Sequence, residues 1–268
     1  MTSRRRPGKE QTTVDNTREF APTTGERIWR AVKEALIILV GAVVVSSVLQ
    51  HFVGQMFLIP SGSMEHTLDI GDRVIAQKIV PVHRGDVVVF RDSAGWLGPE
   101  PLVKRGPVGH ALEFIGVLPD TSQNYLIKRV IGLPGDTVAC CDAVGNLTVN
   151  GRSVDEKAYL YRSETGEQVM PSDIQFRVVV PAGRIFVMGD HRNASADSRC
   201  HLADVVPGEP TGADAFVPLS DVAGVGWAIF APFNRTTILP KATDLAQIPA
   251  ATTPAPDQAS IEPAGVTC

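Results

Sequence analysis

The stretch Asn124-Tyr-Leu-Ile-Lys-Arg-Val-Ile131, followed by Gly132-Leu-Pro-Gly-Asp136, decides how the rest of the chain is interpreted. It is rich in β-branched and aromatic residues and stops at a turn signal, so it predicts a strand. Alternate side chains of a strand share a face, which places Lys128 between Leu126 and Val130. An ammonium group flanked by apolar side chains on a core-facing surface is desolvated, and its pKa falls.

Lys128 has other options on such a strand. Its head could reach water past the apolar side chains, or it could pair with a carboxylate. A buried, neutral lysine is the alternative with chemical consequences. With an ordinary pKa of about 10.4 a lysine is a poor base near neutral pH, whereas a desolvated lysine can deprotonate a serine.

A serine on a tight backbone precedes this strand. Phe57-Leu-Ile-Pro60 leads into Ser61-Gly62-Ser63-Met64, where Pro60 and Gly62 predict a bend just past an apolar run. A nucleophile on a bend exposes its Oγ, and neighbouring backbone N–H groups can point at a developing oxyanion. A Ser-Gly-Ser sequence taken alone is usually only a loop.

A third stretch is dense in short polar side chains. Gly189-Asp-His-Arg-Asn-Ala-Ser-Ala-Asp-Ser-Arg199 follows the strand-like run Arg184–Met188. Hydroxyl groups of such a loop could hold a neutral lysine, and an ion pair between Asp197 and Arg199 could lock the loop. The alternative is a polar surface turn.

Together and in this order, the three stretches resemble the type I signal peptidases of bacteria. That family has a Ser-x-Met box after a membrane anchor, a Lys-Arg-Val-Ile-Gly-x-Pro-Gly-Asp strand and a Gly-Asp-Asn…Ser-x-Asp-Ser-Arg box. The segment Lys128–Asp136 matches the strand without a gap. The last box matches at Gly189, Asp190, Ser195, Asp197, Ser198 and Arg199. The resemblance covers about 56–240 and implies a mostly β catalytic domain of antiparallel sheets after one N-terminal transmembrane helix.

The resemblance implies a role for each matching residue. Ser63 would be the nucleophile and Lys128 the general base, without a metal or another cofactor. The Ser61 hydroxyl and the Ser63 N–H would form the oxyanion hole. Ser195 would orient Lys128. The charged residues that hold the structure of the site would be Asp190, Asp197 and Arg199.

Two positions depart from the family pattern. His66 stands where the family usually has proline, and His191 stands where asparagine is usual. Neither position carries the chemistry in the family, so the departures leave the expected dyad intact.

Other hydrolytic sites fit the sequence less well. A Ser-His-Asp triad could use Asp190 and His191, but the aspartate of a triad bonds the imidazole from the side opposite the serine, which adjacent residues rarely manage. The sequence contains no His-Glu-x-x-His and no Cys-x-x-Cys motif, and His201 beside Cys200 is a single pair.

An apolar run from Ala35 to Val53 precedes the serine. At 1.5 Å per residue it spans about 30 Å, the thickness of a bilayer core. A cleaved secretory signal is disfavoured by the long leader and the lack of a clean A-x-A site. A buried core helix is disfavoured because the run lacks helical periodicity.

The basic residues Arg27, Arg30 and Lys33 precede the apolar run, so the positive-inside rule predicts a cytoplasmic N-terminus and a catalytic domain outside. The expected partners are secreted preproteins with small residues before the cleavage site and the lipid bilayer, with the secretion translocon nearby. A net charge of −4 gives no electrostatic basis for binding nucleic acid.

The predicted organisation has four parts. Residues 1–30 form a largely disordered cytoplasmic tail and 31–55 the transmembrane anchor. Residues 56–240 form the extracytoplasmic serine/lysine peptidase domain, with an insertion at 93–119. Residues 241–268 form a Pro/Ala-rich tail that is expected to be disordered because it lacks the apolar residues of a core.

Two smaller features remain open. The insertion carries Trp96, Leu97 and Leu102, which either dip into the lipid surface or pack on the domain. A disulfide from Cys200 to Cys140 or Cys141 would tie the third stretch to a strand, and oxidation outside the membrane permits it.

Two rival functions also remain. A self-cleaving serine–lysine repressor protease would share the dyad, but the apolar run and the lack of a DNA-reading helical domain disfavour it. A non-enzymatic, membrane-anchored β domain would bind a partner without using Ser63 or Lys128.

Overall fold

The protein is described here by a computed structural model that covers residues 24–52, 54–98, 106–109, 124–263 and 268. The chain forms two compact units, Met1–Val44 and Val45–Cys268.

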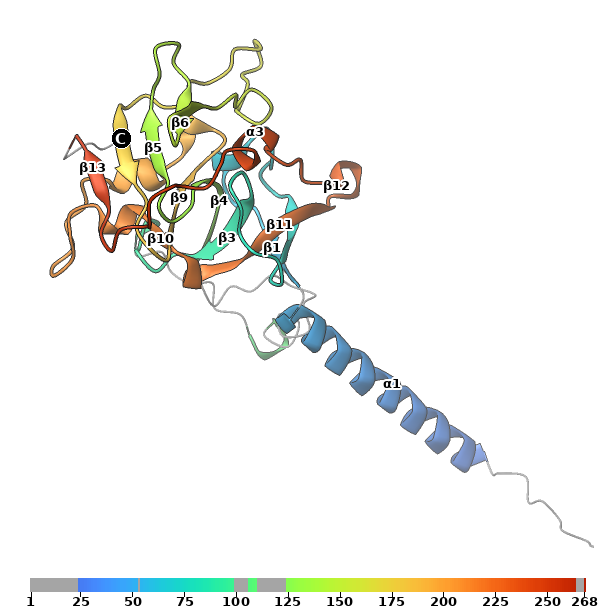
Figure 1. Cartoon of the computed structure of the whole chain (residues 1–268). Coiled ribbons are helices and arrows are strands. Elements are labelled where there is room, and N and C mark those ends of the chain that lie inside the picture. The colour runs from blue at the N-terminus through green and yellow to red at the C-terminus, as the bar shows by residue number, and fades with distance from the viewer. Residues whose placement is uncertain (1–23, 53, 99–105, 110–123, 264–267) are drawn as a thin grey trace, which may run out of the picture. The chain divides into compact units, whose positions relative to one another are not determined.

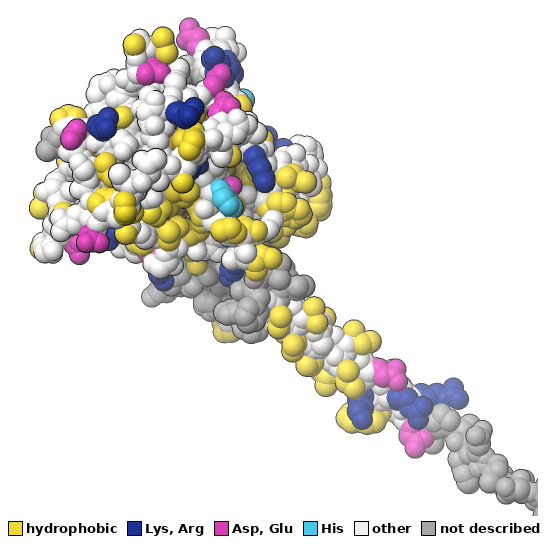
Figure 2. All heavy atoms as spheres, in the orientation of Figure 1, with side chains coloured by type: hydrophobic (Ala, Val, Ile, Leu, Met, Phe, Trp, Pro, Cys, Tyr) yellow, Lys and Arg dark blue, Asp and Glu magenta, His cyan; other side chains and the backbone are white. Residues whose placement is uncertain are grey.

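The helix α1, Thr24–Phe52, is long and apolar. It is the one helix in the described part of the chain that is long and apolar enough to cross a membrane. The candidate span is Thr24–Val48, and an 18-residue window within it has a mean hydropathy of 2.1. The 25 residues of that span cover about 38 Å, more than a bilayer core. Apolar side chains line the helix, and charged ones gather near its N-terminal end (Figure 2). The helix begins earlier than the predicted span of 31–55 and ends before the strand that starts at Gly54.

Two antiparallel sheets dominate the second unit (Figure 1). The strands of the larger sheet are β1 Gly54–Leu58, β2 Arg73–Gln77, β3 Val87–Arg91, β4 Tyr125–Gly132, β9 Arg184–Met188, β10 Val217–Pro218, β11 Val222–Ala231 and β12 Thr237–Ile238. Those of the smaller sheet are β5 Thr137–Cys140, β6 Leu147–Val149, β7 Arg152–Ser153, β8 Phe176–Val179 and β13 Ser260–Glu262. The larger sheet has the order β1-β2-β11-β3-β4-β9-β10, with β12 paired to β11, and the smaller has the order β13-β8-β5-β6-β7. The predicted mostly β, antiparallel fold is confirmed.

Short helices connect these strands. The 3-10 helices are η1 Gly62–Met64, η2 Arg192–Ala194, η3 Ser198–His201, η4 Ala213–Ala215, η5 Leu219–Asp221 and η6 Phe233–Arg235, and a short α-helix, α3, covers Thr243–Ala246.

Strand β3 shows how the sheet is buried on both faces. Its side chains alternate between two apolar clusters, with Val87 and Val89 in one and Val88 and Phe90 in the other. This is why its sequence is a continuous apolar run instead of an alternating pattern. Strand β4 pairs with β3 on one side and, from Arg129 to Gly132, with β9 on the other, and its residues from Ile127 to Gly132 are buried.

The C-terminal segment differs from the expectation of a disordered tail at 241–268. Leu245 of α3 is fully buried and Ile248 is 7% exposed, both in the largest apolar cluster. The Ile248 carbonyl accepts a hydrogen bond from Arg84 Nη1 at 2.6 Å. Farther along, β13 pairs with β8. A few apolar side chains and one strand pairing are therefore enough to order a Pro-rich segment.

The cysteines also pair differently from the expectation. Cys200 bonds Cys268, and Cys140 bonds its neighbour Cys141. The predicted bridge from Cys200 to Cys140 or Cys141 is wrong, because the C-terminal segment brings a nearer partner to η3.

Only part of the predicted insertion at 93–119 lies within the described residues. Trp96 is half-buried and packs on the domain, with its indole N–H bonded to the Asp214 carbonyl and its ring stacked on His201. Leu97 is 41% exposed, and Leu102 lies outside the described residues.

We expect Leu245→Ala to destabilise the second unit by about 2–5 kcal/mol, because the substitution leaves a cavity under α3. Urea unfolding of the full chain in detergent measures this, with Leu219→Ala at a 36% exposed position as the control. Equal stability of the two variants would contradict the packing of the C-terminal segment.

Candidate active site

The geometry of the candidate site starts from Lys128 on β4. Its side chain is buried, at 3% exposure, and its Nζ lies 2.6 Å from the Oγ of Ser63. The two residues are 65 positions apart in the chain. Sequence reasoning paired them, and the structure brings them into contact.

The segment that carries Ser63 is held at both ends. Before η1, the backbone of Ile59 exchanges hydrogen bonds with Gly71 and Asp72. Within η1, the side chain of Met64 is fully buried in the cluster under the sheet. Ser63 is therefore fixed at 6% exposure, while Ser61 just before it is extended and exposed.

Burial dominates the electrostatics of Lys128. Desolvation lowers the pKa of Lys128 from 10.5 to about 8, against the opposing effect of the Asp197 and Asp190 carboxylates. A substantial fraction of Lys128 is therefore the neutral amine near neutral pH. The neutral amine has a lone pair that can accept the Ser63 hydroxyl proton.

Asp197 organises the loop beside the lysine. Its carboxylate accepts hydrogen bonds from Gly189 N and Ser195 Oγ, at 2.9 and 2.8 Å, and from the Arg199 guanidinium at 2.9 Å. Burial opposes the charge, but Arg199 and these donors outweigh it and hold the pKa of Asp197 below its usual value. The predicted Asp197–Arg199 ion pair is present. Ser195, expected to orient Lys128, donates its hydroxyl to Asp197.

Gly189 permits the close approach of three segments. A Cβ on Gly189 would lie 2.3 Å from Ser195 Oγ and 2.5 Å from the Ser63 carbonyl oxygen. Real Cβ atoms do not come so near, so a side chain here would push Ser63 and the third motif apart. The glycine of this Gly-Asp pair is needed for space.

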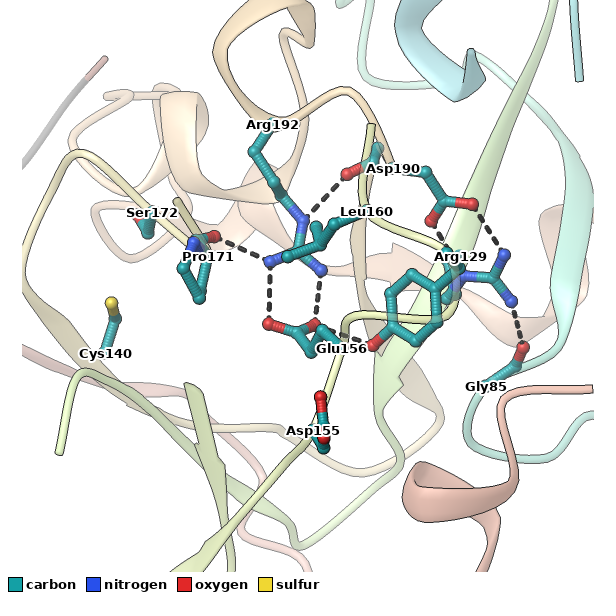
Figure 3. A network of polar contacts seen from close by, with 12 residues as sticks. Gly85, Arg129, Cys140, Asp155, Glu156, Leu160, Pro171, Ser172, Asp190 and Arg192 are labelled. Atoms are coloured by element: carbon teal, nitrogen blue, oxygen red, sulfur yellow. Dashed lines mark hydrogen bonds and ion pairs between the residues drawn. The ribbon is translucent and has the colours of Figure 1, made fainter. Parts of the chain in front are cut away.

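Asp190 pairs with the residue that follows the lysine. Both Asp190 carboxylate oxygens accept from Arg129, at 2.7 and 2.6 Å (Figure 3). Thr67 Oγ1 donates to the same carboxylate. Arg129 also bonds the Gly85 carbonyl at 2.7 Å. Lys128 and Arg129 point to opposite faces of β4, so one strand carries the expected base on one face and a structural cation on the other.

A second buried ion pair lies behind the first. Arg192 forms an ion pair with Glu156 in which its Nη1 and Nη2 each donate a hydrogen bond to the carboxylate, the shorter at 2.5 Å. The Nε of Arg192 donates to the Gly189 carbonyl at 2.8 Å. Figure 3 shows Arg192 and Glu156 facing one another beside Asp190. Tyr159 donates to Glu156 and lies under Arg129, 4.2 Å from its guanidinium carbon.

Sequence reasoning missed this second pair. Arg192 lies inside the third motif, but Glu156 is 36 positions away and nothing in its own stretch marks it. A buried arginine must be paired, so the density of arginines in the third motif was the available signal that a further acid was needed.

The two departures from the family pattern have structural consequences. His66 has a φ of +84°, and Thr67 N bonds the Met64 carbonyl across it, as in a type II turn. Proline, with φ fixed near −65°, could not take this conformation. His191 lies beside the nucleophile turn, with its Nδ1 2.9 Å from Glu65 Oε2.

The alternative triad does not form. Asp190 is engaged by Arg129, and the Ser63 hydroxyl meets Lys128. Within the described ranges, no group of three or more histidine, cysteine, aspartate or glutamate residues is arranged to hold a metal ion.

Comparison with known proteins identifies the family to which the chain belongs. The sequence profile of the family described as signal peptidase, peptidase S26, matches residues 30–231. The chain is 38% identical over 234 residues to a probable signal peptidase I of Mycobacterium leprae, which covers 76% of this chain and 78% of that protein. It is 37% identical over 223 residues to signal peptidase I of Mycobacterium tuberculosis, at 76% and 74% coverage.

Among solved structures, a signal peptidase I from Enterococcus faecalis matches 55% of this chain and 98% of that chain, at 23% identity and a TM-score of 0.30. The family profile covers most of the chain, and the curated relatives agree with it at more than a third identity. The chain therefore belongs to the signal peptidase family, peptidase S26, a family of proteases that process signal peptides.

Proposed function

We propose that this chain is a membrane-anchored serine endopeptidase that removes N-terminal signal peptides from exported preproteins, with Ser63 as nucleophile and Lys128 as general base. Family membership supports the processing of signal peptides by a serine protease. The observation that carries the finer proposal is the 2.6 Å contact between Lys128 Nζ and Ser63 Oγ, made by a lysine buried away from water.

The reaction follows from the dyad. Neutral Lys128 accepts the hydroxyl proton as Ser63 Oγ attacks the carbonyl carbon at the cleavage site. The protonated lysine then gives this proton to the leaving amine, which leaves an acyl-enzyme on Ser63. Lys128, neutral again, takes a proton from water, and the resulting attack releases the acyl group and restores the serine.

The lowered pKa determines how much of Lys128 is present as the neutral amine that the reaction needs. At pH 7, a lysine with a pKa of about 8 has about 300 times more neutral amine than one with the ordinary value of 10.5. Burial therefore contributes a large part of the reactivity by changing the protonation state of one group.

The oxyanion would rest on the Ser63 N–H and the Ser61 hydroxyl. Ser61 precedes η1 with an extended backbone and an exposed side chain, so its hydroxyl can turn toward a bound carbonyl. Asp197 and Ser195 hold the loop against Gly189, which abuts the Ser63 carbonyl, and this keeps the nucleophile at a fixed distance from its base.

Two strand edges next to the dyad support an extended substrate. The described pairing of β4 with β9 runs from Arg129 to Gly132, so the half of β4 from Tyr125 to Lys128 is paired on its β3 side. The other edge is β1, which ends the larger sheet. Phe57 of β1 and Tyr125 of β4 meet edge to face, 5.0 Å between ring centres, so the two edges lie close together. A peptide added here gains main-chain hydrogen bonds that align it with Ser63.

Cleavage after small residues at the first and third positions fits this mode of binding. Alternate side chains of an extended peptide point the same way, so those two positions face the same surface of the enzyme. Shallow pockets there would accept alanine and reject larger side chains by clash.

The apolar helix α1 supports a membrane anchor. Its length exceeds the bilayer core, and Arg27, Arg30 and Lys33 lie near its N-terminal end, which by the positive-inside rule places that end in the cytoplasm. An anchored enzyme meets its membrane-bound substrate at a raised local concentration, near the translocon that delivers it.

Cleavage of a purified preprotein by the full chain in detergent tests the dyad. Ser63→Ala and Lys128→Ala should each lower kcat by about 10⁴-fold or more, because each removes a member of a unit that acts together. Lys157→Ala, at a 74% exposed lysine, should leave the rate unchanged. Mass spectrometry of the products gives the rates and the cleaved bond.

Equal cleavage by all four proteins would refute the dyad. If folded wild-type protein cleaved no preprotein, the non-enzymatic binding domain would become the better interpretation.

The pH dependence of kcat/KM should show an ascending limb with an apparent pKa of about 8. The sign follows from the base being neutral: protonation below this pH removes it, and the rate falls tenfold per pH unit well below the pKa. Initial rates between pH 5 and 10 measure the profile. A rate that is still rising steeply at pH 10 would show that Lys128 keeps the ordinary pKa of a hydrated lysine.

Membrane orientation is tested with an export-dependent phosphatase fused after Cys268, which keeps α3 and β13 in place. We expect phosphatase activity in cells, whereas the same reporter placed before Thr24, with α1 following it, should be inactive. Activity of the second fusion alone would reverse the proposed orientation.

A further inference from the structure

His191 lies at a junction that the proposed reaction does not use. Its backbone N–H donates to the Ser63 carbonyl at 3.1 Å. Its ring Nδ1 lies 2.9 Å from Glu65 Oε2 and 3.3 Å from the Gly62 carbonyl oxygen. All three contacts end on the turn that carries the nucleophile, Gly62–Glu65.

The partners of Nδ1 determine its protonation. A carboxylate oxygen and a carbonyl oxygen both only accept hydrogen bonds. Nδ1 therefore carries the hydrogen in this arrangement, either in the neutral Nδ1–H tautomer or in the imidazolium. His191 is a donor to the nucleophile turn in both forms.

The carbonyl that faces this donor belongs to a particular peptide group. Gly62 C=O and Ser63 N–H are the two ends of one planar, trans peptide, and they point in opposite directions. Any donor that holds Gly62 O on one side therefore sets the direction of Ser63 N–H on the other. The Glu65 backbone N–H, at 3.0 Å from Gly62 O, is one such donor, and His191 Nδ1–H supplies a second.

The imidazole ring is itself held in place. It stacks on the ring of Tyr161, with centroids 3.7 Å apart and planes 17° from parallel, and the His191 side chain is only 14% exposed. The Tyr161 backbone N–H bonds the Asp190 carbonyl at 3.1 Å, so the stacking ring is tied to the same loop as the histidine. A ring fixed on one side by stacking and on the other by Glu65 has little freedom to leave Gly62.

We propose that His191 is a positioning residue of this active site. Its Nδ1–H, steadied by Glu65 and Tyr161, holds the Gly62–Ser63 peptide so that Ser63 N–H points at the developing oxyanion. This inference rests on the proposed function, because it assigns a role in the same reaction.

Two substitutions at His191 separate positioning from simple packing. His191→Ala removes the donor and the ring. His191→Asn removes the ring but keeps an N–H on an atom bonded to Cγ, where Nδ1 stands in histidine. We expect kcat for preprotein cleavage to fall about tenfold in the alanine variant, less than the 10²–10³-fold loss for removing an oxyanion donor itself. KM should stay within about twofold of wild type, since ground-state binding is not altered. The asparagine variant should recover most of kcat.

His201 provides a matched control. Its Nδ1 lies 2.6 Å from Asp204 Oδ2, its ring stacks on Trp96, and its side chain is also 14% exposed. His201→Ala thus removes a stacked, carboxylate-bonded imidazole of equal burial that has no contact with the nucleophile turn. It should leave kcat unchanged. Thermal unfolding of each variant in detergent accompanies the kinetics, so that rates are compared among folded proteins.

Several results would overturn the inference. These are an unchanged kcat in His191→Ala, a rise in KM with kcat preserved, and equal losses in the alanine and asparagine variants. A wild-type protein that cleaves no faster than Ser63→Ala would instead refute the proposed function, and the role of His191 with it. Active wild type, inactive Ser63→Ala and normal kcat in His191→Ala would refute this inference alone.

Discussion

The burial of one amine is the constraint on which the rest of the site depends. Lys128 on β4 is only 3% exposed, and the cost of charging an enclosed amine is what brings its pKa to about 8. Water at Nζ would restore the ammonium form. The apolar cluster under η1 and the loop around Asp197 can both be understood as parts of one wall that keeps this amine away from water and next to Ser63.

A site of this kind must bury further charges to build its wall, and each of them is paired. Arg129 is matched by Asp190, Arg192 by Glu156, and Arg199 by Asp197, with exposures of 2% or less for all six side chains. Breaking one such pair leaves an uncompensated buried charge, which is far costlier than the pair is stabilising. Lys128 is the exception. Among the described contacts, no carboxylate forms an ion pair with its Nζ, and the nearby Asp197 pairs with Arg199 instead. That difference distinguishes the proposed base from the three paired arginines.

The sequence predicted the elements whose signal is local. Each of three features lies within a short motif: the strand with Lys128, the bend with Ser63, and the Asp197–Arg199 pair. The resemblance to a known family indicated that the three motifs form one site. The sequence could not predict the partners of Arg192 or Cys200, because Glu156 and Cys268 are distant in the chain and carry no pattern of their own. Leu245 shows a related limit: a single apolar anchor in a Pro-rich segment has no periodicity, so composition alone predicted disorder where packing creates order.

The distance along the chain between the proposed base and the proposed nucleophile determines when the dyad can form. Ser63 and Lys128 are separated by 65 residues, and the loop that steadies them begins beyond both, at Gly189. In an unfolded chain Lys128 is hydrated and protonated, and Ser63 is an ordinary alcohol. The proposed dyad therefore does not form gradually during synthesis. It forms only when long-range strand pairing is complete, so a chain that has not finished folding would lack it.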